Sequence, residues 1–402
     1  MLELAGLWDK HLSTVDLCLE RAGSDPGLRA ELINLKSGVL TLMGRYDEAL
    51  EACLQADAIY ISLGDVRGRA ACAGCIGRIY TERGDYPRAV EMLTRQLEAA
   101  EENGDSRGLA RIIGNIGINH MYQGKYSQAM EKFQRMLQLS EQNHDLRNMA
   151  TALGNIGMVM LYQADYRGAL GKFTQMMSLA RRIGDKRLEL HALISTGNIY
   201  EAQEDLEAAG QVFAAALDMA LRLGDRRNIG YALANLGYVH LARKEYTKAE
   251  VFLSKQLSLA LEMGDRRSQN YAYSNLGGVY LETGRYAEAE QAYQRRLEIA
   301  EELGDRQNIG AAWLEMGRLC QTLGETKRAE ECFIRSESIA RELNDKLTLA
   351  NVLLSYGELM RSVTERKEYA FAKLQEAWKV SDEAGLQKQK EQAQKLMDSM
   401  GE

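Results

Sequence analysis

One aspartate returns every forty residues along most of this chain, and this spacing restricts the folds that the chain can adopt. The aspartates are Asp25, Asp65, Asp105, Asp145, Asp185, Asp225, Asp265, Asp305 and Asp345. A fixed period of this length is typical of solenoids, whose short units bury their apolar faces only against neighbouring units. The sequence therefore predicts an elongated stack of repeats rather than a globular core.

Glycine and tyrosine recur with the same period and indicate what each unit contains. Glycine precedes most of the aspartates, which predicts a helix end followed by a helix start, because glycine adopts the left-handed conformation after a helix and aspartate caps the next one. A second glycine recurs at Gly77, Gly117, Gly157, Gly197, Gly237, Gly277, Gly317 and Gly357. Tyrosine with alanine three residues later recurs at Tyr46, Tyr86, Tyr126, Tyr166, Tyr246 and Tyr286. Each unit is expected to hold helix A, from the aspartate, and helix B, from the tyrosine.

Composition agrees with an all-α protein and excludes several partners. The 402 residues include only 2 prolines and are rich in strong helix formers. The net charge of −7 gives nucleic acid no overall attraction, and no apolar run approaches the roughly 20 residues that cross a bilayer. Six irregularly placed cysteines are typical of a reducing compartment. We therefore expect a cytoplasmic protein with no nucleic-acid or membrane partner.

No motif of catalysis, cofactor binding or metal binding stands out. Cys72-Ala-Gly-Cys75 has the spacing of a zinc or redox pair, but it lies inside a helix A and no second pair accompanies it. The five histidines lack ligand spacing, and His120 and His240 fill the core column that holds Tyr80, Tyr200 and Tyr280 in other units. The chain is expected to be no enzyme, and to need no cofactor or metal.

The repeated columns resemble the tetratricopeptide repeat over nearly the whole chain. Leu-Gly occurs in the middle of helix A, Tyr or His follows three residues later, and alanine with a large apolar residue occurs in helix B. The forty-residue length and the Asn-Leu/Ile-Gly triplet are most similar to Pins-type spindle-orientation adaptors and kinesin light chains. The resemblance implies an α-solenoid, a right-handed superhelix of antiparallel helix pairs whose A helices line a concave face.

The columns also predict the boundaries of the repeats. Residues 1–22 are expected to be an N-terminal capping helix, 25–343 eight helix pairs, 345–385 a ninth and degenerate pair, and 386–402 a C-terminal capping helix. The ninth pair is assigned as degenerate because the register slips by one between Met360 and Ala372.

The phase of the helix A glycine predicts which side chains face inward. Two residues before it stand Cys75, Asn115, Asn155, Ser195, Asn235, Asn275, Glu315 and Ser355. A carboxamide both donates and accepts hydrogen bonds, and the resemblance implies that such an asparagine ladder holds the backbone of an extended peptide. The alternative is that each asparagine bonds within its own repeat and shapes the turn between helices.

Two flanking columns are expected to set specificity. Six residues before the glycine stand Ala71, Arg111, Thr151, His191, Tyr231, Tyr271, Ala311 and Asn351. One residue after it stand Arg78, Ile118, Met158, Asn198, Tyr238, Gly278, Arg318 and Glu358. Aromatic and methionine side chains are typical anchors of peptide grooves, although the tyrosines could instead pack as core. The candidate site is Arg111, Asn115, Thr151, Asn155, Met158, Ser195, Asn198, Tyr231, Asn235, Tyr238, Tyr271, Asn275, Glu315 and Arg318.

An arginine column follows the aspartates by two residues. Its members are Arg67, Arg107, Arg147, Arg187, Arg227 and Arg267. A cation in the first helical turn opposes the helix dipole, so another interaction must favour it. We expect an ion pair with a carboxylate of the adjacent helix B; contact with an acidic partner at the groove edge is the alternative.

These observations predict a protein-interaction scaffold that holds an extended or part-helical segment of a partner in its concave channel. An alternative is the regulatory or sensor arm of a larger assembly whose catalytic domain, such as a protease, cyclase or nuclease, is absent from this chain. A third is a scaffold that mainly self-associates, or a sensor of a short signalling peptide. The chain is expected to be a monomer or a weak homo-oligomer.

Overall fold

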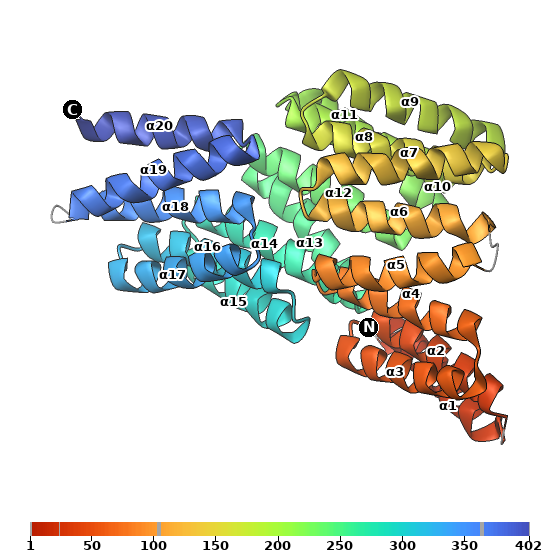
Figure 1. Cartoon of the computed structure of the whole chain (residues 1–402). Coiled ribbons are helices and arrows are strands. Elements are labelled where there is room, and N and C mark those ends of the chain that lie inside the picture. Colours follow the sequence, from red (N-terminus) through yellow and green to blue (C-terminus); the bar gives the residue numbers. More distant parts are fainter. Residues whose placement is uncertain (1, 24, 103–105, 362–365, 402) are drawn as a thin grey trace. The chain divides into compact units, whose positions relative to one another are not determined.

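The structure is a computed structural model that describes residues 2–23, 25–102, 106–361 and 366–401. Within those ranges it contains twenty α-helices and no strand, which confirms the all-α solenoid (Figure 1). The chain forms two compact units, Met1–Arg266 and Arg267–Glu402.

Unit 1 contains the helices α1 (Leu2–Arg21), α2 (Pro26–Leu42), α3 (Tyr46–Leu63), α4 (Val66–Glu82), α5 (Tyr86–Glu102), α6 (Ser106–Tyr122), α7 (Tyr126–Gln142), α8 (Leu146–Tyr162), α9 (Tyr166–Ile183), α10 (Lys186–Ala202), α11 (Leu206–Leu223), α12 (Arg226–Ala242) and α13 (Tyr246–Met263). Each of these helices contacts the next one along the chain. Helix α1 also contacts α13, so the stack of unit 1 turns far enough to bring its first and last complete helices together.

Unit 2 contains the helices α14 (Arg266–Glu282, which begins at the boundary), α15 (Tyr286–Glu302), α16 (Arg306–Thr322), α17 (Thr326–Glu342), α18 (Lys346–Arg361), α19 (Lys367–Ala384) and α20 (Gln387–Gly401). Helices α15 to α20 each contact their chain neighbours, and α20 packs against both α18 and α19. Tyr356 stands where most other A helices carry Ile, Leu or Met, and its fully buried ring packs 6.0 Å from that of Phe333. The pair with irregular sequence, α18 and α19, therefore has a continuous apolar core.

The aspartate column caps the A helices as predicted. Asp65 accepts a hydrogen bond from the backbone N–H of Gly68 at 3.0 Å, and Asp185 accepts from those of Arg187 and Leu188, both at 3.1 Å. These N–H groups have no partner within the helix, so the carboxylate satisfies them. The same bond is made by the aspartates Asp25, Asp145, Asp225, Asp305 and Asp345.

The glycine in the middle of the A helices from α4 onward lets helix B approach closely. A Cβ added to Gly157 would lie 2.8 Å from the ring of Phe173, and one added to Gly237 would lie 2.5 Å from Leu253. Real Cβ atoms essentially never approach that closely, so an alanine would require the facing side chain or its helix to shift. Gly237 and Leu253 thus mark a close contact between α12 and α13.

His120 on α6 is partly buried within unit 1. Among the described residues, its buried Nδ1 has no hydrogen-bond partner. Burial, with smaller contributions from Lys125 and Lys132, lowers the pKa of His120 below its usual value. The unfolded chain therefore takes up a proton more readily than the folded chain does.

We expect this histidine to make stability depend on pH. Its contribution is complete above the unfolded pKa of about 6.5 and is lost as the pH falls from there through the lower folded pKa, because protonation then favours the unfolded chain. Urea titrations at pH 7 and pH 5 measure the loss. His120→Met, which copies Met160 of the next unit, should reduce it, and an equal loss in this variant would contradict the assignment.

Candidate functional site

The A helices of unit 1 form a wall that carries most of the candidate residues. Helix α6 contacts α8, α8 contacts α10, and α10 contacts α12. Asn115, Asn155, Ser195 and Asn235 occupy the same position on these four helices, and each is partly buried. The pattern therefore places one short polar side chain per helix along a single wall.

The ladder asparagines differ from the other asparagines of the A helices in their hydrogen bonds. Among the described residues, no hydrogen bond is made by the side chain of Asn115, Asn155, Asn235 or Asn275. The asparagines of other columns do make such bonds, and they are Asn119, Asn148, Asn228, Asn270 and Asn308. Asn119 Nδ2, for example, donates to the carbonyl oxygen of Asn115 at 2.9 Å. The ladder amides are therefore available to a ligand.

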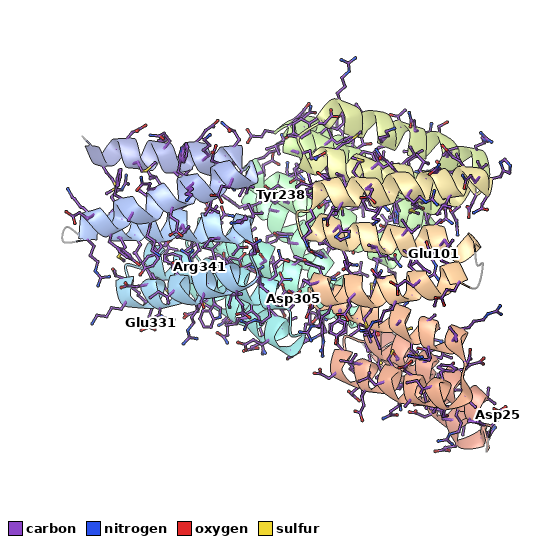
Figure 2. The ribbon with its side chains drawn as sticks, viewed as in Figure 1. Asp25, Glu101, Tyr238, Asp305, Glu331 and Arg341 are labelled. Carbon is purple, nitrogen blue, oxygen red and sulfur yellow. The ribbon has the colours of Figure 1, made fainter. Side chains whose placement is uncertain are left out.

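Two tyrosines of α12 border the same wall. Tyr231 and Tyr238 retain 50% and 44% of their surface exposed, so neither is a core residue, and Figure 2 places Tyr238 on this helix. Partial burial, together with the carboxylates of Glu201 and Glu204, raises the pKa of Tyr238 above its usual value. Both rings therefore offer apolar surface beside the ladder.

Other predicted residues of unit 1 have partners within the protein. Thr151 Oγ1 donates to the carbonyl oxygen of Arg147 at 3.0 Å, and Met158 is partly buried against the apolar clusters of α8 and α9. Ser195 and Asn198 are partly buried on α10. These side chains therefore form part of the surface of the wall and project little from it.

At the α4 and α6 end of the wall stand two exposed arginines, Arg78 and Arg111. No ion pair joins either of them to a carboxylate among the described residues. The Nη2 of Arg78 donates to Cys75 Sγ at 3.5 Å. Arg78 lay in a predicted inward column but outside the candidate site, and its lack of a carboxylate partner is what distinguishes it.

In unit 2 the ladder position of α16 is Glu315, and a buried arginine balances its charge. Arg296 of α15 is almost fully buried and forms an ion pair with Glu315 of α16, which also accepts a hydrogen bond from Ser274 Oγ at 2.7 Å. Arg318 Nε donates to Ser355 Oγ at 3.0 Å. Sequence columns did not reveal Arg296, because it belongs to a helix B. The carboxylate of Glu315 is therefore balanced from within the protein.

The remaining candidates of unit 2 lie on α14. Tyr271 is 45% exposed, so it is no more a core residue than the tyrosines of α12. Asn275 is partly buried at the ladder position of this helix.

The predicted arginine column forms ion pairs, but with a different partner from the one expected. Arg147 Nε donates to Asp185 Oδ2 at 2.9 Å, and Arg187 Nε lies 3.5 Å from Asp225 Oδ2. Arg147 and Arg187 thus contact the capping aspartate of the next helix A, not a carboxylate of helix B, because arginine and aspartate lie at the same edge of the stack. An ion pair with helix B is made instead by the arginine one residue earlier in the sequence: Arg226 Nη2 lies 2.5 Å from Glu262 Oε2.

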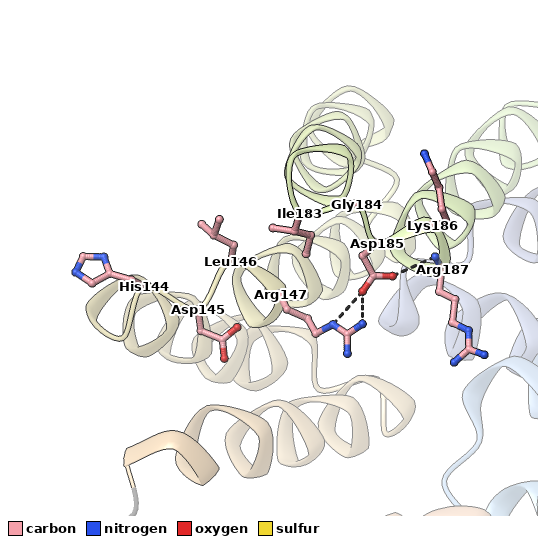
Figure 3. Close-up of a pocket in the computed structure, with 9 residues that line it drawn as sticks. All are labelled: His144, Asp145, Leu146, Arg147, Ile183, Gly184, Asp185, Lys186 and Arg187. Atoms are coloured by element: carbon pink, nitrogen blue, oxygen red, sulfur yellow. Dashed lines mark hydrogen bonds and ion pairs between the residues drawn. The ribbon is translucent and has the colours of Figure 1, made fainter.

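Figure 3 shows this edge between α8 and α10, where Arg147 reaches Asp185 across an open hollow of about 630 Å³. The backbone N–H groups of Leu188 and Arg187 and the guanidinium of Arg147 outweigh the effect of burial and lower the pKa of Asp185. The side chain of Arg107 lies outside the described residues.

The family of the chain follows from comparison with known proteins. The tetratricopeptide repeat family model matches residues 28–102, 68–142, 228–302 and 268–342. The chain belongs to the tetratricopeptide repeat family. A second family model, for anaphase-promoting complex subunit 5, matches residues 116–203. Comparison with curated proteins gives no match.

Solved structures show the same tetratricopeptide fold at low sequence identity. A Rap protein complexed with competence and sporulation factor is 15% identical, with 89% of this chain and 99% of that chain covered and a TM-score of 0.60. The Rap conjugation gene regulator of plasmid pLS20, in complex with the Phr* peptide, is 15% identical, with 86% and 97% covered and a TM-score of 0.56. A signal transduction ATPase with a tetratricopeptide repeat sensor, from Pyrococcus horikoshii, is 14% identical, with 88% and 55% covered and a TM-score of 0.53.

Two features of the described residues concern membranes and metals. None of these helices is both long and apolar enough to span a membrane. Within the same residues, no group of three His, Cys, Asp or Glu side chains is placed to hold a metal ion.

Proposed function

We propose that this protein is an interaction scaffold that binds an extended peptide segment of a partner protein along the A helices of unit 1. The observation that carries the proposal is the ladder of Asn115, Asn155 and Asn235, whose amides make no hydrogen bond within the described protein. Unpaired amides at one position of successive helices match the repeating N–H and C=O groups of an extended backbone. The Rap conjugation gene regulator of the same fold, solved in complex with the Phr* peptide, supports this choice of ligand.

The two ends of the wall suggest what the peptide carries. Arg78 and Arg111, which lack carboxylate partners among the described residues, favour an acidic side chain or a terminal carboxylate near α4 and α6. Tyr231 and Tyr238 favour an apolar or aromatic side chain near α12. The ligand we propose is therefore a peptide with an acidic group and an apolar anchor, held between them through its backbone.

Selection from a library of random peptides, displayed with free C-termini, tests this proposal. We expect the purified full chain to enrich peptides that combine an acidic group with an apolar residue at a fixed separation. Arg111→Glu should remove the acidic preference while retaining the apolar one, because the charge at that end is reversed. Arg182→Glu, on the exposed last turn of α9, is the matched control and should select the same peptides as the wild type. Failure to enrich any peptide, or the same acidic preference in Arg111→Glu, would contradict the proposal.

A further inference from the structure

The first helix A of unit 1, α2, carries three exposed leucines in a row. Leu28, Leu35 and Leu42 keep 43%, 57% and 56% of their surface exposed. Their spacing of seven residues places them on one side of the helix, about two turns apart. Leu35 stands forty residues before Cys75, so it occupies the ladder position of α2. Together these side chains form the leucine stripe.

The leucine stripe adjoins the arginine end of the wall. Helix α2 contacts α4, which carries Arg78. Gly38 lies between Leu35 and Leu42 in the sequence of α2. A Cβ added to Gly38 would lie 3.9 Å from Arg78 Nη2, so the guanidinium stands directly beside the stripe. The apolar side chains of α2 and the cations of α4 and α6 therefore belong to one continuous surface.

This end of the wall offers no amide to an extended backbone. The ladder amides begin at Asn115, whereas the preceding ladder positions hold Leu35 and Cys75. The N–H and C=O groups of an extended segment would lose water on the leucines without gaining a partner, which costs free energy. A helix satisfies these groups internally and needs only side-chain contacts. The leucine stripe therefore favours a helical ligand over an extended one.

Two charged side chains of opposite sign accompany the stripe. Glu31 is exposed on α2 between Leu28 and Leu35, and Arg78 stands beside the other half of the stripe. Among the described residues, no ion pair joins Glu31 or Arg78 to an opposite charge. A ligand gains charge-assisted contacts if it places a basic residue near Glu31 and an acidic residue near Arg78. The two charges therefore favour one direction of a helix along α2.

We propose that the leucine stripe binds an amphipathic helix of the partner protein, with an acidic residue of that helix against Arg78. The outer leucines, Leu28 and Leu42, are separated by about 21 Å along α2, at a rise of about 1.5 Å per residue. The bound helix therefore has about fourteen residues, with apolar side chains along one face. This inference rests on the proposed function, because the surface that it extends is the wall that holds the extended segment.

Selection from a helical peptide library tests the proposal. The library displays peptides of about 18 residues with leucine fixed at the a and d positions of each heptad, and with alanine, glutamine, glutamate or lysine elsewhere. We expect the purified full chain to enrich peptides with glutamate at one fixed position. Arg78→Glu should replace that preference by lysine and retain the leucines, because only the charge beside the stripe is reversed.

Two double variants then locate the binding surface. Leu35→Glu with Leu42→Glu should weaken an enriched peptide by roughly tenfold or more in fluorescence anisotropy, because apolar contact is lost at two positions. Leu54→Glu with Ile61→Glu is the matched control, since these side chains of α3 have the same spacing and are 55% and 54% exposed. The control should bind as the wild type does. Glutamine replaces glutamate in both pairs if circular dichroism shows a loss of helix.

Three results would overturn the proposal. The first is a library that yields no binder, and the second is an affinity that the α3 control reduces as much as the α2 variant does. The third is a full chain that light scattering shows to be a dimer and that Leu35→Glu with Leu42→Glu converts to a monomer. In that case the stripe contacts a second copy of this chain and not a partner helix.

Replacement of the ladder amides distinguishes this inference from the proposed function. The full chain with Asn115, Asn155 and Asn235 changed to alanine should bind the helical peptide as tightly as the wild type, because the helix uses none of these amides. A wild-type chain that enriches random peptides but no helical peptide contradicts only the helix site. A chain that enriches helical peptides but no random peptide contradicts only the extended segment.

Discussion

Simultaneous replacement of Asn115, Asn155 and Asn235 by alanine is expected to weaken binding of a selected peptide by roughly one to three powers of ten. Each lost hydrogen bond costs about 0.5–1.5 kcal/mol, so three cost about 1.5–4.5 kcal/mol, and ~1.4 kcal/mol corresponds to a tenfold change. The fold should be retained, because these side chains make no hydrogen bond within the described protein and alanine is the better helix former. Fluorescence anisotropy titration with a peptide from the library selection measures the change.

A control variant from the same helices distinguishes a role of the asparagines in peptide binding from a role in stabilising their own repeats. Asn148 and Asn228 donate to the capping aspartates of their own helices, at 2.8 Å and 3.1 Å. Asn148→Ala with Asn228→Ala should therefore lower the melting temperature and leave the peptide affinity unchanged. The opposite pattern, in which the ladder variant melts earlier but binds normally, would show that the ladder amides support their own repeats.

Phe173→Ala is expected to destabilise the middle of unit 1 by about 3–5 kcal/mol, the usual cost of deleting a buried phenylalanine. The ring is 1% exposed and packs with Leu153, Met176 and Ile199. It also lies against Gly157, which has no side chain to fill the space. Urea denaturation measures the loss of free energy, and hydrogen exchange locates it.

The loss should be local, because repeats contact mainly their neighbours. Amides of α8 and α9 should exchange faster in Phe173→Ala, while those of α2 and α3 should change little. Phe173→Leu is the matched control, since Leu93 and Leu253 occupy the equivalent position in other repeats, and it should cost less than the alanine variant. Equal acceleration of exchange along the whole of unit 1 would contradict a repeat-by-repeat response.

Local features of the fold could be predicted because each depends on few residues. A glycine with a left-handed backbone followed by a capping aspartate is determined within one turn, and the φ angles of Gly64 and Gly184, 66° and 69°, confirm it. The forty-residue period then repeats the prediction along the chain. His144 shows the limit of this reasoning, because it adopts the same conformation, with φ of 54°, without being glycine.

Contacts between residues of different columns could not be predicted, because the forty-residue period relates only residues of the same column to one another. Arg296, for example, approaches Glu315 across the joint between a helix B and the following helix A. The division into two units after Arg266 also lacks a sequence signal, since the period continues through it. The inward position of the ladder could be inferred from phase, but whether its amides have partners depends on neighbouring side chains.

Because the capping aspartates recur every forty residues without insertion, the gene of this protein can gain or lose whole repeats. Asp145 and Asp185 both cap an A helix and both accept a backbone hydrogen bond three residues later. Removal of residues 146–185 would join Asp145 to Lys186, and the capping aspartate would again precede a complete helix A. Unequal recombination within the array therefore exchanges intact helix pairs, each with one position of the ladder. Such recombination can thus change the length of the binding wall, and the amino acids along it, one repeat at a time.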